Sequence, residues 1–348
     1  MVQKQANPRK KKPAASAAAP PPKARRRPST SKSDDAALSL PRQQRLLNHF
    51  MTAFADVLAA AELPPLLQTI KQALYRRDFA AAFGCEAHLA AYAARWSPPR
   101  ALCYAGLFQA HLPACTATRM VCVGGGAAEL VAFASFLGDD DDDDGAHSSR
   151  RGELTLVDAA PWEGVADTVL RALTTPLPLS PYASASAHAA NAPLLAQSPE
   201  QLRLRVVRQD VLHVTEGQWA DMFAPGSAPV VVTLLFTLNE LYTEGGIAQT
   251  TRFLRALEAA LPDGSLLLVV DSPGSYSEAA LGKDEKKYPM QWLLHHTLTK
   301  PASASTEWTR LESHDSIWFR LSDQLKYPIQ LENMRYQLHL YRIDKTPT

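Results

Sequence analysis

The sequence predicts a doubly wound α/β domain, in which a mainly parallel sheet carries helices on both faces. Apolar runs alternate with segments of helical periodicity over residues 120–270, which is typical of this fold class. The apolar runs are continuous and not alternating, as expected for parallel strands covered on both sides. The predicted strands are Met120–Val123, Leu154–Val157, Leu204–Val207, Val230–Phe236 and Leu266–Val270.

Helices are predicted both between these strands and ahead of them. A helical region, 42–115, precedes the α/β domain, 116–348, because its apolar residues follow helical spacing between proline breaks at 64–65 and 98–99. Within the domain the expected helices are Ala127–Leu137, Trp162–Leu173, Gln218–Phe223 and Gly246–Leu261. The last is the clearest, since it ends in the helix stop PDG.

The C-terminal end departs from the strand–helix rhythm. The segments SIWFRL (316–321) and MRYQLHLYRI (334–343) alternate strongly, with no helical pattern between them. Such alternation indicates two strands paired antiparallel at the edge of the sheet.

The first 41 residues differ in composition from the rest of the chain. Residues 1–33 hold ten Lys or Arg and no acid, whereas the remainder holds 26 basic and 35 acidic residues. The segment is rich in Pro, Ala and Ser and has few apolar side chains, so we expect a disordered tail. Its basic clusters suit nuclear import or RNA contact, and the alternative is a merely solubilising tail.

Two insertions, 138–152 and 174–202, interrupt the α/β pattern. The first contains six consecutive aspartates, and the second is rich in Pro, Ala and Ser. Each follows a predicted helix and precedes a strand, which places it at the amino ends of the strands. Ligands of such sheets bind at the carboxyl ends. We therefore expect surface loops outside the site.

Several classes of protein and site are not favoured. The longest apolar runs are too short to cross a bilayer, so no membrane partner is expected. Cys85, Cys103, Cys115 and Cys122 lack metal-type spacing and indicate a reduced intracellular protein. The histidines show no ligand spacing either, and 295–296 is expected to be helical. No metal site is therefore predicted, and we expect a monomer.

A glycine turn follows the first predicted strand, in RMVCVGGGAAELVAF (119–133). Gly124, Gly125 and Gly126 let a ligand approach the backbone at a helix start, which suits a nucleotide-like cofactor. The nicotinamide pattern G-x-G-x-x-G fails, because Glu129 stands at its last glycine. The looser G-x-G-x-G of S-adenosylmethionine (SAM)-dependent methyltransferases fits better, although Ala128 replaces its third glycine and Cys122 the usual acid before the turn.

Acidic residues at the ends of later strands favour the same cofactor. Asp158 can accept hydrogen bonds from two ribose hydroxyls, and Asp210 from an adenine amino group, with Val211 packed on the ring. Either aspartate can instead be a helix cap. Glu129, at the start of the helix, and Thr237, after the fourth strand, complete the predicted cofactor-binding set.

Six segments together resemble the fungal large-subunit ribosomal RNA (25S rRNA) uridine-N3-methyltransferases. They are RWSPPRALCYAGLF, VCVGGGAAELVAF, LLFTLNELY, VVDSPGSYSE, KYPMQWLLHHTL and YPIQLENMRYQLHLYRI, and the resemblance spans residues 42–345 without the insertions. It implies a class I, Rossmann-like, SAM-dependent enzyme of the nucleus or nucleolus. Its partner would be large-subunit rRNA or a pre-ribosomal particle, in which it methylates one uridine. The alternatives are another acceptor, or an assembly factor that has lost catalysis.

Methylation of uracil N3 suggests roles for residues near the last strands. N3 is an imide N–H, so a base that removes its proton promotes transfer, and cations near O2 or O4 stabilise the resulting charge. We expect Asn239 to orient the base and Glu240 to accept the proton or hold the cofactor's amine. The alternative for Glu240 is a carboxylate that only stabilises the start of a helix. Asp271 is the rival base, and Ser272 and Pro273 form a wall of the same pocket.

The helical region is expected to cover the cofactor or to contact RNA, and the candidate residues there are Arg95, Arg100 and Tyr104. Arg335 can meet a carbonyl oxygen or a phosphate, or form an ion pair between strands. A flipped uridine can stack on an aromatic ring, although most such rings belong to the core. The rings considered are Trp96, Tyr104, Tyr276 and Trp318.

Overall fold

The computed structural model describes residues 38–113, 117–138, 150–189, 191–196, 199–223, 228–274, 278–281, 286–300 and 305–346. The predicted disordered tail, except for its last residues, lies outside the described residues, as do the six consecutive aspartates and Tyr276. The second insertion is largely described and contains the short helix α9 (Ala185–Ala189).

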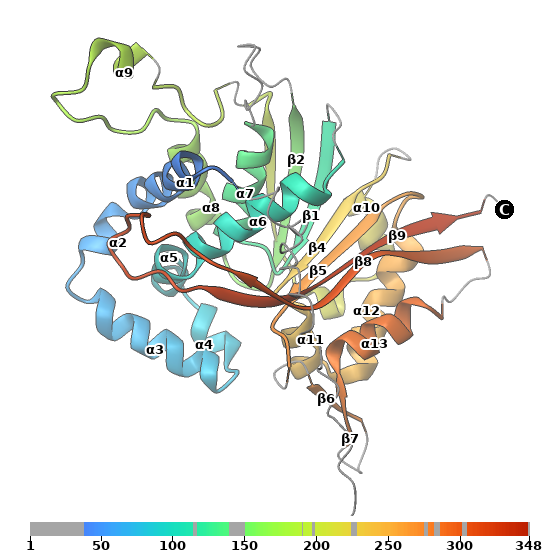
Figure 1. The fold of residues 1–348 in the computed structure, drawn as a ribbon. Coiled ribbons are helices and arrows are strands. Elements are labelled where there is room, and N and C mark those ends of the chain that lie inside the picture. The colour runs from blue at the N-terminus through green and yellow to red at the C-terminus, as the bar shows by residue number, and fades with distance from the viewer. Residues whose placement is uncertain are drawn as a thin grey trace, which may run out of the picture. The chain divides into compact units, whose positions relative to one another are not determined.

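A seven-stranded sheet in the order β3-β2-β1-β4-β5-β9-β8 forms the centre of the described chain (Figure 1). The first five strands in that order are parallel, and β9 pairs antiparallel with both β5 and β8. The strands are β1 Ala117–Val123, β2 Arg151–Asp158, β3 Leu202–Arg208, β4 Val231–Leu235, β5 Leu266–Asp271, β8 Thr306–Phe319 and β9 Met334–Lys345. The predicted fold class, with its antiparallel C-terminal pair, is confirmed.

Side chains of β1 show why this sheet is covered on both faces. Met120 and Cys122 belong to one apolar cluster, and Val121 and Val123 to another. Successive side chains of a strand point to opposite faces, so both faces of this central strand are buried. The strand order reverses between β1 and β4, and this switch point is where open α/β sheets bind ligands.

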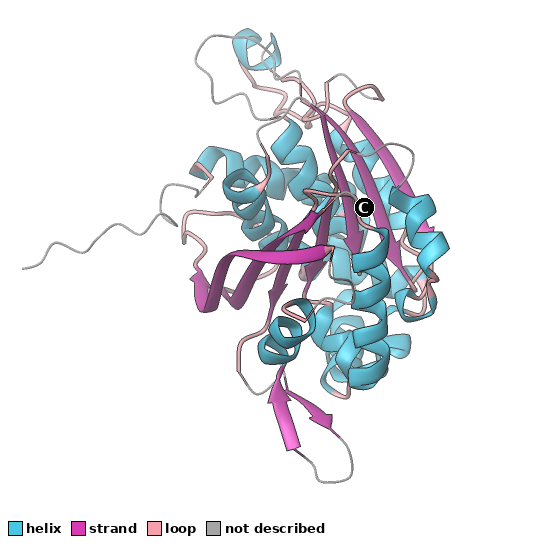
Figure 2. Cartoon of the chain, turned by 90° about the vertical axis from the view of Figure 1, so that its right-hand side faces the viewer, coloured by secondary structure: helices cyan, strands magenta, loops and turns pink. Residues whose placement is uncertain are grey.

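Helices pack on both faces of the sheet, as Figure 2 shows from the side. The N-terminal helices share the apolar cluster that contains α7 and α8. They are α1 Leu40–Ala53, α2 Ala55–Ala59, α3 Leu63–Tyr75, α4 Phe79–Phe83, α5 Glu86–Arg95 and α6 Ser97–His111, followed by α7 Ala127–Leu137 and α8 Glu163–Leu173. The opposite face carries α10 Glu216–Phe223, α11 Leu238–Glu244, α12 Gly246–Ala260 and α13 Met290–Leu298. Within the described ranges, no helix has the length and apolar character needed to cross a membrane.

Three features were not expected from the sequence. Strand β8 begins at Thr306, well before the alternating segment, because irregularities after Arg310 and His314 interrupt its pairing with β9 and hide the alternation. Helix α11 directly follows β4 and is absent from the predicted helices, although a helix start was the alternative considered for Glu240. A hairpin of β6 (Glu278–Leu281) and β7 (Lys286–Pro289) extends away from the main sheet (Figure 2).

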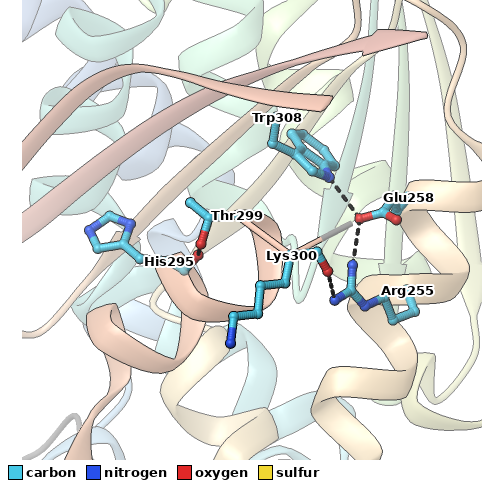
Figure 3. A network of polar contacts seen from close by, with 6 residues as sticks. All are labelled: Arg255, Glu258, His295, Thr299, Lys300 and Trp308. Atoms are coloured by element: carbon cyan, nitrogen blue, oxygen red, sulfur yellow. Dashed lines mark hydrogen bonds and ion pairs between the residues drawn. The ribbon is translucent and has the colours of Figure 1, made fainter. Parts of the chain in front are cut away.

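Polar contacts join α12 to the C-terminal edge of the sheet (Figure 3). The Glu258 carboxylate is buried, and its Oε2 accepts hydrogen bonds from Trp308 Nε1 at 3.0 Å and from Arg255 at 2.9 Å. Arg255 also donates to the carbonyl of Lys300. Each charge in this network therefore meets a partner of opposite polarity, as a buried structural contact requires.

Candidate active site

Two cavities lie at the switch point and share part of their lining. The outer cavity, about 440 Å³, lies at the carboxyl ends of β1 to β4, and its volume is in the range of small-molecule sites. The inner cavity, about 50 Å³, reaches Tyr92, Ser97 and Arg100 of the N-terminal helices. The residues lining both are Phe83, Gly124, Asp158, Thr237 and Glu240.

The glycine turn is held by close contacts. Gly124 has a left-handed φ of +69°, and a Cβ there would lie 2.3 Å from Oγ1 of Thr237. That hydroxyl donates to the carbonyl of Val123 at 3.1 Å, which fixes Thr237 at the floor of the cavities. A Cβ on Gly125 would meet the side chain of Cys122, and one on Gly126 the ring of Trp162. No larger residue fits here without rearrangement.

The two departures from the methyltransferase glycine pattern fit the packing. Cys122 is fully buried in the core, and Ala128 is buried at the start of α7. A carboxylate is nevertheless present at the turn, because Glu129 Oε2 accepts the Gly126 N–H at 2.8 Å and Glu129 lines the inner cavity. Burial raises the pKa of Glu129, and the hydrogen bond from Gly126 opposes that change.

Both predicted strand-end aspartates line the outer cavity. Asp158 Oδ1 accepts the Ala160 N–H at 2.7 Å, and burial raises the pKa of Asp158 to about 7. Asp210 Oδ1 accepts the Leu212 N–H at 2.9 Å, while its Oδ2 lies 2.6 Å from Nδ1 of His213. Each aspartate thus stabilises its own turn and also lines the cavity. The two predicted roles, a cap and a cofactor ligand, are therefore compatible.

Glu240 and Arg100 face the inner cavity from opposite sides of the switch point. Glu240 comes from α11 and Arg100 from α6, and the pKa of Glu240 is raised to about 8 by burial, against the opposing charge of Arg100. The guanidinium of Arg100 lies 4.8 Å from the ring centroid of Phe236 and donates to the hydroxyl of Tyr92. Phe236 has a φ of +60°, a strained value for an aromatic residue that is typical of functional sites.

Asp271 is buried at the end of β5 and is not among the residues that line the two cavities. Its Oδ2 accepts the Asn239 N–H at 2.9 Å and its Oδ1 the Ser272 N–H at 2.7 Å. Burial raises the pKa of Asp271 to about 6 against these two bonds. The carboxylate therefore fixes the start of α11, which carries Asn239 and Glu240, and the loop after β5.

Other predicted acceptor residues lie away from the cavities. Ser272 and Pro273 are partly exposed at the end of β5. Arg95 forms an ion pair with Glu332 at 2.7 Å, and Tyr104 is fully buried. The three aromatic and basic residues that remain are Trp96, which packs on Tyr92, and the exposed Trp318 and Arg335.

The cavity walls also include residues that the sequence did not single out. Phe79 and Phe83, on α4, line the outer cavity with Glu244, and Trp162 lines the inner one. The segment FAAAF has apolar residues at helical spacing. This pattern does not distinguish residues that pack in the core from residues that line a ligand cavity. For Trp162, the one available signal was its position in the loop after β2, close to Asp158, which indicates a place near the cavities.

The charge balance of the cavities indicates the kind of ligand they suit. Five carboxyl groups line them, those of Glu129, Asp158, Asp210, Glu240 and Glu244, against the guanidinium groups of Arg100 and Arg208. Burial raises the pKa of Glu129, Asp158, Glu240 and Glu244, so their ionised forms are under-compensated here, and a cationic ligand would relieve this. SAM carries a sulfonium and an ammonium group, so these residues fit it. No group of three metal-binding side chains occurs in the described part of the chain.

Comparison with known proteins places this site in a family. A family model described as a SAM-dependent methyltransferase matches residues 50–342. The 25S rRNA (uridine(2843)-N(3))-methyltransferase of Saccharomyces cerevisiae is 32% identical over 301 residues, covering 79% of this chain and 76% of the yeast protein.

Solved structures with a similar arrangement have low sequence identity. The 1,6-didemethyltoxoflavin-N1-methyltransferase of Burkholderia thailandensis, solved with S-adenosylhomocysteine, is 14% identical with a TM-score of 0.38, covering 80% of this chain and 89% of that one. A 16S rRNA (adenine(1408)-N(1))-methyltransferase from Catenulisporales acidiphilia is 17% identical with a TM-score of 0.35, covering 66% and 89%. No conclusion about this chain rests on either likeness.

Proposed function

Because this chain belongs to the family of SAM-dependent methyltransferases, we propose that it methylates N3 of a uridine in large-subunit rRNA. The printed activity of the yeast relative, at 32% identity over most of both chains, supports this acceptor. An rRNA substrate also places the enzyme in the nucleus or nucleolus, with a pre-ribosomal particle as its partner. The observation that carries the proposal is the acid-rich pair of cavities at the switch point, in which five carboxyl groups face two guanidinium groups.

In the outer cavity, we assign the cofactor to the residues at the ends of β1, β2 and β3. Asp158 would accept hydrogen bonds from the ribose hydroxyls, and Asp210 from the adenine amino group, beside Val211. The glycine turn and Thr237 leave backbone open to the cofactor, and Glu129 contributes negative charge at the start of α7. When bound, SAM supplies a methyl group on a positively charged sulfur, already activated for transfer.

The inner cavity would hold the edge of the uracil. Glu240 lines both cavities, and no donor among the described residues hydrogen-bonds its carboxyl group, so it is free to take the N3 proton. Arg100 would stabilise the negative charge that then spreads to a uracil carbonyl oxygen. Asn239 would orient the base, while Asp271 acts through the position of α11, because both of its oxygens already accept backbone N–H groups.

Nucleoside mass spectrometry of large-subunit rRNA tests the proposal. The gene is deleted and complemented with the wild type, Asp158→Ala, Glu240→Ala or the control Asp221→Ala, whose acid is exposed on α10. We expect one mapped 3-methyluridine to disappear on deletion, and to return with the wild type and the control but not with the two site variants.

Other results would identify a different function. If every mapped 3-methyluridine persists in the deletion strain, the acceptor is wrong. If the modification disappears but both site variants restore it, the cavities are not where transfer takes place. A ribosome assembly defect that both site variants repair, with no change in methylation, would support a non-catalytic assembly factor.

A further inference from the structure

Strands β8 and β9 continue past the end of β5 (Figure 1). Asp271, the last residue of β5, pairs with Gln337 of β9. The side chain of Gln337 donates to the carbonyl of Ser272 at 2.8 Å. The part of β9 that precedes Gln337 pairs with β8 alone, with Arg335 opposite Trp318. This two-stranded ribbon therefore begins beside Asp271, the residue that positions α11 and its Glu240.

The ribbon presents an aromatic ring with two cations to solvent. Trp318 is 54% exposed, which is unusual for the largest apolar side chain. The guanidinium carbons of Arg320 and Arg335 lie 5.3 Å and 5.9 Å from its ring centroid. We call Trp318, Arg320 and Arg335 the ribbon platform. Arg335 Nε also donates to Ser316 Oγ at 2.7 Å, which orients its guanidinium beside the ring.

No carboxylate of the described residues pairs with either arginine of the platform. Two acids near the ribbon have other partners, since Glu332 pairs with Arg95 at 2.7 Å and Glu312 with His314 at 2.7 Å. The ion pair considered for Arg335 from the sequence is therefore not formed within the described chain. Neither guanidinium group thus has a carboxylate partner among the described residues, and the indole beside them is more than half exposed, so the platform is accessible to a ligand.

We propose that the ribbon platform binds a single-stranded segment of the substrate rRNA beside the target uridine. An unpaired base would stack on the indole, and the guanidinium groups would contact the flanking phosphates. The chain after residue 33 has a net charge of −9, so RNA needs a local cationic contact of this kind to approach the site. An acidic peptide would pair with the arginines but would leave the indole unused. The inference rests on the proposed rRNA substrate.

Filter binding of an in vitro transcript of large-subunit rRNA tests the platform. We expect Trp318→Ala to weaken binding about tenfold, the worth of one lost base stack, and Trp318→Phe to restore most of it. Replacing Arg320 and Arg335 with Ala should reduce the slope of log K against log salt by about 1.4, or about 0.7 per lost phosphate contact. The matched control is Arg205→Ala, an exposed arginine on β3. SAM affinity, measured by calorimetry, should be unchanged in all of these variants.

The platform is wrong if the Trp318 and double-arginine variants bind the transcript like the wild type, or if Arg205→Ala lowers the slope as much per residue. A salt effect of the arginines without any effect of Trp318→Ala would indicate general attraction and also overturn base stacking. These results are independent of the proposed reaction. Platform-dependent binding without formation of 3-methyluridine would refute the proposed function alone, and methylation with unaffected variants would refute the platform alone.

Discussion

Two regions of this molecule bury acidic side chains, and they treat them in opposite ways. Between α12 and β8, the carboxylate of Glu258 receives hydrogen bonds from Trp308 and Arg255 (Figure 3). At the switch point, Glu240 faces the cavities with no hydrogen-bond donor among the described residues, and burial raises its pKa to about 8.

The presence or absence of hydrogen-bond donors distinguishes acids that stabilise the fold from acids that are available to bind a ligand. A buried carboxylate with its donors in place contributes to the native structure, and removing it leaves those donors unsatisfied. A buried carboxylate without donors is destabilised in its ionised form. A bound cationic ligand offsets that cost. Asp271 is intermediate, because it is buried beside the site yet both of its oxygens accept N–H groups. The comparison can be tested from both sides.

The largest expected effect is on catalysis by Glu240→Gln. If Glu240 takes the N3 proton, the amide variant should lower the methylation rate on rRNA about 100- to 1,000-fold, the usual range for loss of a general base. The measurement is single-turnover transfer of labelled methyl from SAM. A rate within threefold of the wild type would remove Glu240 from the chemistry.

The same variant should be more stable than the wild type when no cofactor is bound. The pKa of Glu240 in the folded chain, about 8, lies above its ordinary value of 4.5, so its stabilising contribution is fully present below pH 4.5 and is lost as pH rises from there through 8. Gln does not ionise and keeps that contribution, so the advantage of the variant should grow by about 2–3 kcal/mol between pH 6 and pH 9. Urea denaturation at pH 6 and pH 9 measures it, and equal gains at both values would contradict this account.

Sequence reasoning predicted one half of this site better than the other. Asp158, Asp210 and the glycine turn lie at strand ends, and the ends of parallel strands meet at one edge, so local pattern was enough to bring them together. The inner cavity is different, because Arg100 reaches it from α6, through packing of the N-terminal helices that no local pattern encodes.

The role of Asp271 was hidden for a related reason. It stands at a strand end, like Asp158, and the sequence alone made it an equal candidate for the base. A helix here was only the alternative considered for Glu240, and the sequence did not indicate that the N–H of Asn239 donates to the Asp271 carboxylate. Local sequence thus predicts which acids come together, whereas the donors around each acid decide which of them remain available, and those depend on tertiary structure.

An intermediate effect is expected for Glu258→Ala, which tests the structural member of the comparison. The change leaves Trp308 Nε1 and Arg255 without their buried acceptor, and it should lower the free energy of unfolding by about 2 kcal/mol. SAM affinity of the folded protein should stay within twofold of the wild type. Urea denaturation and calorimetry provide the two readouts, and a selective loss of SAM binding without loss of stability would reverse the assignment of the two regions.

The smallest effect is the pH dependence of cofactor binding by the wild type. Asp158, with a pKa of about 7, and Glu240, with a pKa of about 8, are protonated in the free enzyme at pH 6 and ionised at pH 9. A cation binds the ionised form better, so SAM affinity should rise about tenfold over this interval, or one pKa unit of differential interaction. S-adenosylhomocysteine, which lacks the sulfonium charge, should gain less.

Titration calorimetry with both ligands, on the wild type and on Glu240→Gln, separates the contributions of the two carboxyl groups. The variant should lose the increase in SAM affinity above pH 7 and keep the increase below pH 7. If SAM affinity instead falls as pH rises, the carboxylates do not face the cofactor's charge, and the contrast between the two regions would need another cause.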